Sequence, residues 1–194
     1  MKPAWALNFL LRKKFELSQL KDHVEEGSNI AISVGDYFST MLDQALNWNH
    51  AEALKSKWNG KFCLKGIMSP RDARKAVDIG ADAIMISNHG GRQLDGSRSP
   101  FDQLEEIVQE VGGETDIILD GGIQRGTHIL KAMALGATAC SGGRMYLFAL
   151  AAAGRLGVEK ALENIRSEVE RDMKLMGLRS LKEINRGMLR FRRG

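Results

Sequence analysis

Residues 83–92 read Ala-Ile-Met-Ile-Ser-Asn-His-Gly-Gly-Arg. Four apolar residues stand before a polar loop that contains two glycines. The apolar run is too short for a helix and lacks the alternation of a half-exposed strand. It therefore predicts a buried strand of a parallel sheet, followed directly by a loop.

The same pattern recurs along the chain from Lys61 onward. Further apolar runs predict strands at residues 62–64, 117–119 and 137–140. Helices are expected from Pro70, from Pro100 to Val111, from Thr127 to Leu135, from Tyr146 to Ala153 and from Val158 to Met176. Strands that alternate with helices indicate βαβ units with right-handed crossovers.

Two α/β architectures fit this alternation, a doubly wound sheet and a TIM barrel. The sequence contains neither the Gly-x-Gly-x-x-Gly pattern of dinucleotide-binding folds nor a P-loop pattern. Instead, glycine-rich polar loops follow three successive strands, at residues 87–92, 120–122 and 142–144. Such loops build the active site of a barrel at the carboxyl ends of its strands. We therefore expect an α/β fold of the TIM-barrel type.

The first 60 residues have a different character. They hold an apolar start, a basic cluster at residues 12–14, a polar stretch and then helical spacing between Asp36 and Lys57. We expect residues 1–60 to be an irregular and helical segment, and residues 61–194 to be the barrel unit. Apolar residues 5–11 beside the basic cluster leave two interpretations open, a peripheral membrane anchor and a packed helix with a solvated basic end.

The composition is that of an ordinary globular domain, with 43% hydrophobic and 27% charged residues among 194. No stretch approaches the roughly 20 apolar residues of a membrane-spanning helix. A net charge of +4 is small for this length, so we do not expect a nucleic-acid partner. Cys63 and Cys140 cannot form a disulfide framework, and no signal-peptide cleavage site follows the N-terminus. A reducing, cytoplasmic location is expected.

The glycine-rich loops suit a phosphate group. Glycines let backbone N–H donors approach an anion closely, and a nearby helix start or cation adds attraction. Gly121 and Gly122 precede a predicted helix, and Gly143 precedes Arg144, whose guanidinium can bind two oxygens at once. A single glycine pair would be read as an ordinary turn, but two such loops at successive strand ends favour a phosphate site.

His89 is the candidate for proton transfer. It lies between polar residues and glycines, three positions before Arg92, and this arrangement suits an imidazole beside an anion-binding cation. The other histidines have no metal-ligand spacing with one another or with the cysteines, so we expect no metal site. Lys65, at the end of the first strand, faces the same edge of the sheet.

Residues 87–95 resemble the signature of the FMN-dependent 2-hydroxy-acid dehydrogenases and oxidases, the family of respiratory L-lactate dehydrogenase, mandelate dehydrogenase and glycolate oxidase. Further similar segments follow in the family's order, at residues 64–67, 120–123, 131–137, 143–144 and 181–184. The similarity covers residues 61–183, and parts of residues 1–60 resemble the variable segment after the family's fourth strand.

The resemblance implies a role for each candidate residue. His89 would take the proton of the 2-hydroxy acid, Arg92 would bind the substrate carboxylate, and Lys65 would lie beside N1 and O2 of the flavin. The cofactor would be FMN. Its other contacts would come from Ser87, Asp120, Gly121, Gly122, Ile123, Gln124, Arg125, Gly143 and Arg144.

Two features depart from the family pattern. Gln124 stands where the phosphate motif usually has arginine, so FMN binding would weaken unless Arg125 or Arg144 compensates. Gly142 also replaces a larger apolar residue. In addition, a complete barrel has eight strands and about 250 residues, whereas this chain resembles strands five to eight only.

Three hypotheses about function follow. The first is FMN-dependent oxidation of a small, lactate-like L-2-hydroxy acid to the 2-oxo acid, completed by an N-terminal half-barrel or by self-association. The second is an inactive half-barrel that at most binds FMN or phosphate. A third, another phosphate-binding barrel, leaves His89 and Arg92 unexplained. Self-association is expected because a sheet face containing Ile84, Ile86, Ile118 and Leu119 would otherwise meet water.

Overall fold

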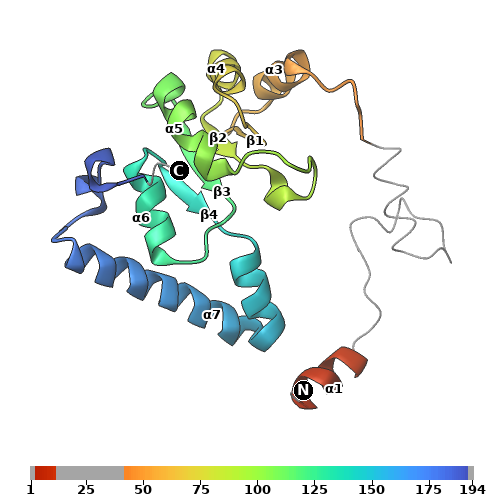
Figure 1. Ribbon diagram of the computed structural model, residues 1–194. Helices are drawn as coiled ribbons and strands as arrows, with labels where there is room; N and C mark the ends of the chain where they lie inside the picture. The colour runs from red at the N-terminus through yellow and green to blue at the C-terminus, as the bar shows by residue number, and fades with distance from the viewer. Residues whose placement is uncertain (1–2, 12–41, 192–194) are drawn as a thin grey trace. The chain divides into compact units, whose positions relative to one another are not determined.

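The computed structural model describes residues 3–11 and 42–191 (Figure 1). The chain divides into two units that meet in sequence between Asn47 and Trp48. The second unit begins with helix α3 (Trp48–Lys57) and contains the sheet. No helix of the described residues combines the length and apolar character needed to cross a membrane.

The first unit contains helix α1 (Pro3–Leu11). The basic cluster at residues 12–14, and residues 36–41 of the expected helical segment, lie outside the described residues. Within that segment, residues 42–47 form a turn, whereas the expected helix at its end is confirmed as α3. The cause of the turn is local: the Asp43 carboxylate accepts a hydrogen bond from the Ala45 amide at 2.8 Å and competes with helical bonding.

The predicted strands are confirmed as a parallel sheet with the order β1-β2-β3-β4. The strands are β1 (Cys63–Lys65), β2 (Ala83–Ile86), β3 (Asp116–Asp120) and β4 (Ala139–Ser141). Each strand pairs with its neighbour in the sequence, with a helix in each crossover. Sequential parallel strands of this kind are typical of a segment of a TIM barrel.

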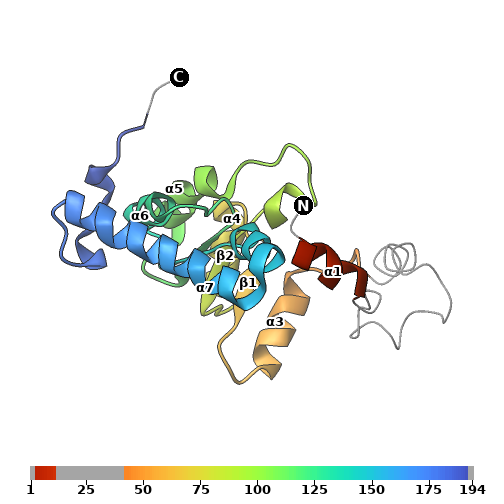
Figure 2. The same ribbon diagram turned by 90° about the horizontal axis from the view of Figure 1, so that it is seen from below.

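The crossover helices are α4 (Pro70–Asp78), α5 (Pro100–Val111) and α6 (Gly126–Ala134). The first two start as predicted, since Ser69 and Ser99 each accept a hydrogen bond from an amide three residues ahead, at 3.1 Å. In each case proline occupies the first turn. Neighbouring helices pack in pairs, α4 with α5 and α6 with α7 (Arg144–Leu175) (Figure 1, Figure 2).

Helix α7 (Arg144–Leu175) contains a break at the position where the sequence predicted two helices. Ala153 and Gly154 leave the helical region, and Gly154 has a φ of 60°, which glycine adopts without strain. Two short 3-10 turns, η3 (Leu181–Glu183) and η4 (Arg186–Met188), follow, and η4 packs against α6.

One face of the sheet carries the hydrophobic core. The register aligns Ile84 with Ile117 and Ile86 with Leu119, so these four side chains share a face. All are at most 1% exposed, and they form one cluster with apolar residues of α4, α5 and α6. Fully burying an isoleucine or leucine is worth about 1.5–3 kcal/mol, so this layer is the main source of stability.

The expected composition of the barrel-interior face is therefore wrong for three of its four residues. Ile84, Ile86 and Leu119 lie beneath the helices, and only Ile118 lies on the opposite face, aligned with the half-buried Met85. Adjacent residues of a strand point to opposite faces, so Ile118 and Leu119 cannot share one.

The two faces can be tested with one pair of neighbouring substitutions. We expect Ile117→Ala to lower the free energy of unfolding by about 2–5 kcal/mol, because it leaves a cavity in the core. Ile118→Ala should cost clearly less, because its side chain is only half-buried. Urea denaturation of both variants measures the difference, and equal losses would contradict the assignment of the faces.

Candidate active site

Three polar side chains converge at the carboxyl ends of the first three strands. Lys65 ends β1, Ser87 follows β2 and Asp120 ends β3. The Lys65 ammonium lies 2.7 Å from Asp120 Oδ2 and 2.8 Å from Ser87 Oγ, and Ser87 Oγ lies 2.6 Å from the same carboxylate oxygen. The sequence predicted all three as cofactor contacts, and the fold brings them into direct contact with one another.

The Ser87 hydroxyl is the central group of this triangle. It donates its proton to Asp120 and accepts hydrogen bonds from Lys65 and from the backbone amide of His89, the latter at 3.1 Å. One donor and two acceptor positions are all that a hydroxyl offers. Ser87 is 4% exposed, so its bonding fixes both the strand ends and the start of the His89 loop.

Asp120 remains ionised despite its partial burial. Burial raises the pKa of this carboxyl group. Hydrogen bonds from Lys65, Ser87 and Ser141 together lower the pKa by more than burial raises it, so the net pKa lies below its ordinary value. Ser141 was missed by the sequence analysis. The register aligns it with Asp120 at the end of β4, so all four strands contribute to the site.

The loop after β2 presents His89 and Arg92 on the surface at this edge. His89 has a φ of 58°, in the left-handed region that non-glycine residues rarely adopt. The Asn88 side chain accepts a hydrogen bond from the Gly91 amide at 3.2 Å, and Arg144 donates one to the Gly90 carbonyl at 3.0 Å. The loop is therefore held from within and from the start of α7.

The loop after β3 has the form of an anion cradle. Gly121 and Gly122 have φ values of 101° and 73°, and a side chain on either would point into open space. Gly143, before α7, is equally open, and the Gly121 amide donates to the Ser141 carbonyl at 3.1 Å. This glycine backbone carries no side chains and lies beside Lys65, Arg144 and the start of α7. Such an arrangement fits the phosphate end of FMN.

The remaining predicted cofactor contacts have different surroundings. Ile123 is buried in the core, and Gln124 is exposed. Arg125 forms an ion pair with Glu168 of α7, with 2.8 Å between Nε and Oε1. No local sequence pattern indicates Glu168, because its contact with Arg125 spans 43 positions along the chain.

Gly142 has a packing role. A side chain there would bring its Cβ to 3.3 Å from the Ile123 carbonyl oxygen. That approach is tighter than ordinary van der Waals contact, so the loops after β3 and β4 fit closely because this residue is glycine.

The chain is similar to known proteins over most of its length. The model of the family described as FMN-dependent dehydrogenase matches residues 1–191. L-lactate dehydrogenase of Azorhizobium caulinodans is 39% identical over 96% of this chain and 49% of its own length. The 2-hydroxyacid oxidase of Dictyostelium discoideum is 43% identical over 84% of this chain and 42% of its own. The chain thus spans about half the length of these curated relatives.

Solved structures show the same fold. A mandelate oxidase mutant with a monooxide FMN adduct superimposes with a TM-score of 0.70 at 45% identity, covering 73% of this chain and 45% of that one. A flavocytochrome b2 mutant gives a TM-score of 0.72 at 40% identity, covering 79% and 41%. At these identities the similarity extends beyond the fold to the family.

The lowered pKa of Asp120 predicts a pH-dependent contribution to stability. A carboxylate whose folded pKa is depressed stabilises the fold above its unfolded pKa, about 4, and loses this effect as pH falls through the folded value. The stability difference between wild type and Asp120→Asn should therefore shrink below about pH 4. Urea denaturation across pH measures it, with Asp116→Asn, at the exposed start of β3, as control. A difference that stays constant in acid would contradict the assignment.

Proposed function

The chain belongs to the FMN-dependent dehydrogenase family, and on this premise we propose that it supplies the catalytic half of a barrel that oxidises a small, lactate-like L-2-hydroxy acid to the 2-oxo acid. The observation that carries the proposal is the triangle of Lys65, Ser87 and Asp120 beside the His89 loop. This arrangement places Lys65, the cation expected beside the flavin, and His89, the candidate base, at one edge of the sheet.

FMN is the cofactor of the family, and it supplies the acceptor for the two electrons of the oxidation. Gly122, Gly143 and Arg144 would hold the phosphate, through backbone N–H groups and a guanidinium. Gly121, whose own amide donates to the Ser141 carbonyl, would let the phosphate approach the loop closely because it has no side chain. Ser87 and Asp120 would contact the rest of the cofactor. For Gln124 and Arg125, a role in cofactor binding remains a prediction from the sequence.

Lys65 would supply positive charge next to the flavin ring. Its ammonium group is fixed by Asp120 and Ser87, so it does not have to reorganise during the reaction. Preorganised charge of this kind stabilises the negative charge that develops as electrons arrive. The Asp120 carboxylate fixes the position and the orientation of the Lys65 ammonium group.

His89 and Arg92 would act on the substrate. The imidazole of His89 would remove the hydroxyl proton of the substrate, the general-base role for which histidine is most often used. The Arg92 guanidinium would bind the substrate carboxylate through two parallel hydrogen bonds. Both residues are exposed at the edge where the glycine loops lie, which is where barrel enzymes bind their substrates.

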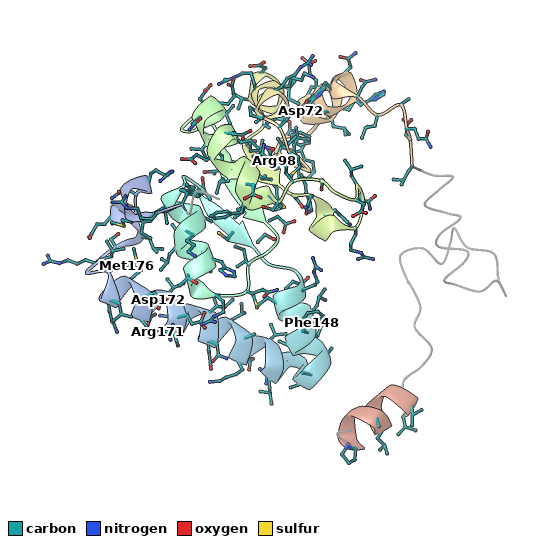
Figure 3. The ribbon with its side chains drawn as sticks, viewed as in Figure 1. Asp72, Arg98, Phe148, Arg171, Asp172 and Met176 are labelled. Carbon is teal, nitrogen blue, oxygen red and sulfur yellow. The ribbon has the colours of Figure 1, made fainter. Side chains whose placement is uncertain are left out.

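A complementary half-barrel would cover the surfaces that this unit leaves open. In the described residues, β1 and β4 each pair with one strand only, and Met85 and Ile118 are half-buried on the face without helices. The first half of α7 exposes Tyr146, Leu147, Phe148 and Leu150. Of these, Phe148 is labelled in Figure 3. We propose an N-terminal half-barrel as the partner, with a second copy of the chain as the alternative.

Complementation tests the function. The chain is co-purified with the N-terminal half-barrel of an L-lactate dehydrogenase relative, and bound FMN is measured by absorbance. Anaerobic addition of L-lactate should bleach the flavin. His89→Gln should keep the flavin bound but slow bleaching by about 10²–10⁴-fold, because base catalysis contributes that much. His50→Gln serves as the control.

The outcomes of this experiment separate the hypotheses. Bound flavin without bleaching in the unsubstituted protein would favour the inactive half-barrel that binds FMN only. Near-normal bleaching in His89→Gln would remove His89 from the mechanism.

Arg92 can be tested in the same assembly through substrate dependence. Arg92→Lys keeps the charge but loses the planar guanidinium, so KM for L-lactate should rise. Arg92→Met should raise KM further, since it removes the charge as well. Arg155→Met, on the exposed side of α7, is the matched control. Unchanged KM in both Arg92 variants would refute the carboxylate-binding role.

A further inference from the structure

Helix α6 begins with a cap that comes from another helix. Its N-cap residue, Arg125, gives no side-chain hydrogen bond to the helix. Instead, the Gly126 amide donates to Glu168 Oε2 of α7 at 2.7 Å. A carboxylate at the amino end of a helix satisfies a free N–H group and interacts favourably with the helix dipole.

The same carboxylate also holds Arg125. Glu168 Oε1 lies 2.8 Å from Arg125 Nε, and the Glu168 side chain is 20% exposed, whereas that of Arg125 is 61% exposed. The hydrogen bond from Gly126 lowers the pKa of Glu168, burial raises it and Arg125 lowers it, with a net lowering. Glu168 is therefore ionised at neutral pH and binds both neighbours at once.

The contact between α6 and α7 leaves no space for adjustment at this point. A Cβ on Gly126 would lie 2.6 Å from the Glu168 Cβ and 2.6 Å from the Val169 amide nitrogen. The backbones of the two helices approach each other closely here, so the loop that ends at Gly126 has a fixed end point. The other end of that loop is Asp120, which Lys65 and Ser87 hold.

We infer that Glu168 is a positioning residue for the phosphate-binding loop, residues 120–125. This rests on the proposed function. Since Gln124 carries no charge and Arg125 is paired with Glu168, the phosphate charge would be met by Arg144 and by the amides of Gly122 and Gly143.

The test compares FMN with riboflavin, which lacks the phosphate, in the complemented protein. Glu168→Ala should weaken FMN binding by about tenfold, the effect of one charge-assisted hydrogen bond, and leave riboflavin binding unchanged. Glu168→Gln should restore part of the loss, because its amide oxygen still accepts from Gly126. Arg125→Gln should change FMN binding by no more than about twofold. Glu159→Gln, which breaks an exposed ion pair of α7, is the control.

Two results would overturn the inference. Equal losses for FMN and riboflavin in Glu168→Ala would mean a general structural role. A loss in Arg125→Gln as large as in Glu168→Ala, seen for FMN only, would mean that Arg125 binds the phosphate itself.

Hydrogen exchange of the chain without flavin separates this inference from the proposed function. Amides of residues 120–126 should exchange faster in Glu168→Ala than in wild type or in Glu159→Gln. Unchanged exchange would overturn the positioning role whether or not flavin binds. Absence of flavin binding by the unsubstituted complex, with the exchange result intact, would overturn the proposed function alone.

Discussion

The carboxylate of Asp120 is the group on which the arrangement of the site depends. It binds the ammonium of Lys65 and the hydroxyl of Ser87 from two other strands. These contacts exist because parallel strands end at the same edge of the sheet. Alternate residues of a strand also point to the same face, so Lys65, Ser87 and Asp120 lie on one face. Without this carboxylate, a lysine and a serine would be left at the strand ends without the charge that holds them together.

Much of the fold could be predicted from the sequence because its signals are local. Serine followed by proline at 69–70 and 99–100 defined two helix starts, and the short apolar runs located the four strands within two residues. The loops after the strands could also be identified, since glycine and polar residues cluster there. The predicted His89 loop and glycine loops lie at one edge for the same reason.

The remaining features depend on contacts between distant parts of the chain. Whether Ile117 or Ile118 faces the helices is decided by the register of β2 with β3, and an unbroken apolar run carries no alternation from which to read it. Ser141 joins the site only through its alignment with Asp120. Glu168 is one acidic residue among several on α7, and only tertiary packing distinguishes it from its neighbours.

The conformation of His89 places a limit on how this protein could be made more stable. Its backbone lies in the left-handed region, where a non-glycine residue stores about 1–3 kcal/mol of strain. Glycine would relieve that strain, and asparagine would reduce it. Selection or engineering for thermal resistance alone would therefore favour replacing this histidine. Under the proposed function, histidine at this position trades stability for reactivity at a single residue.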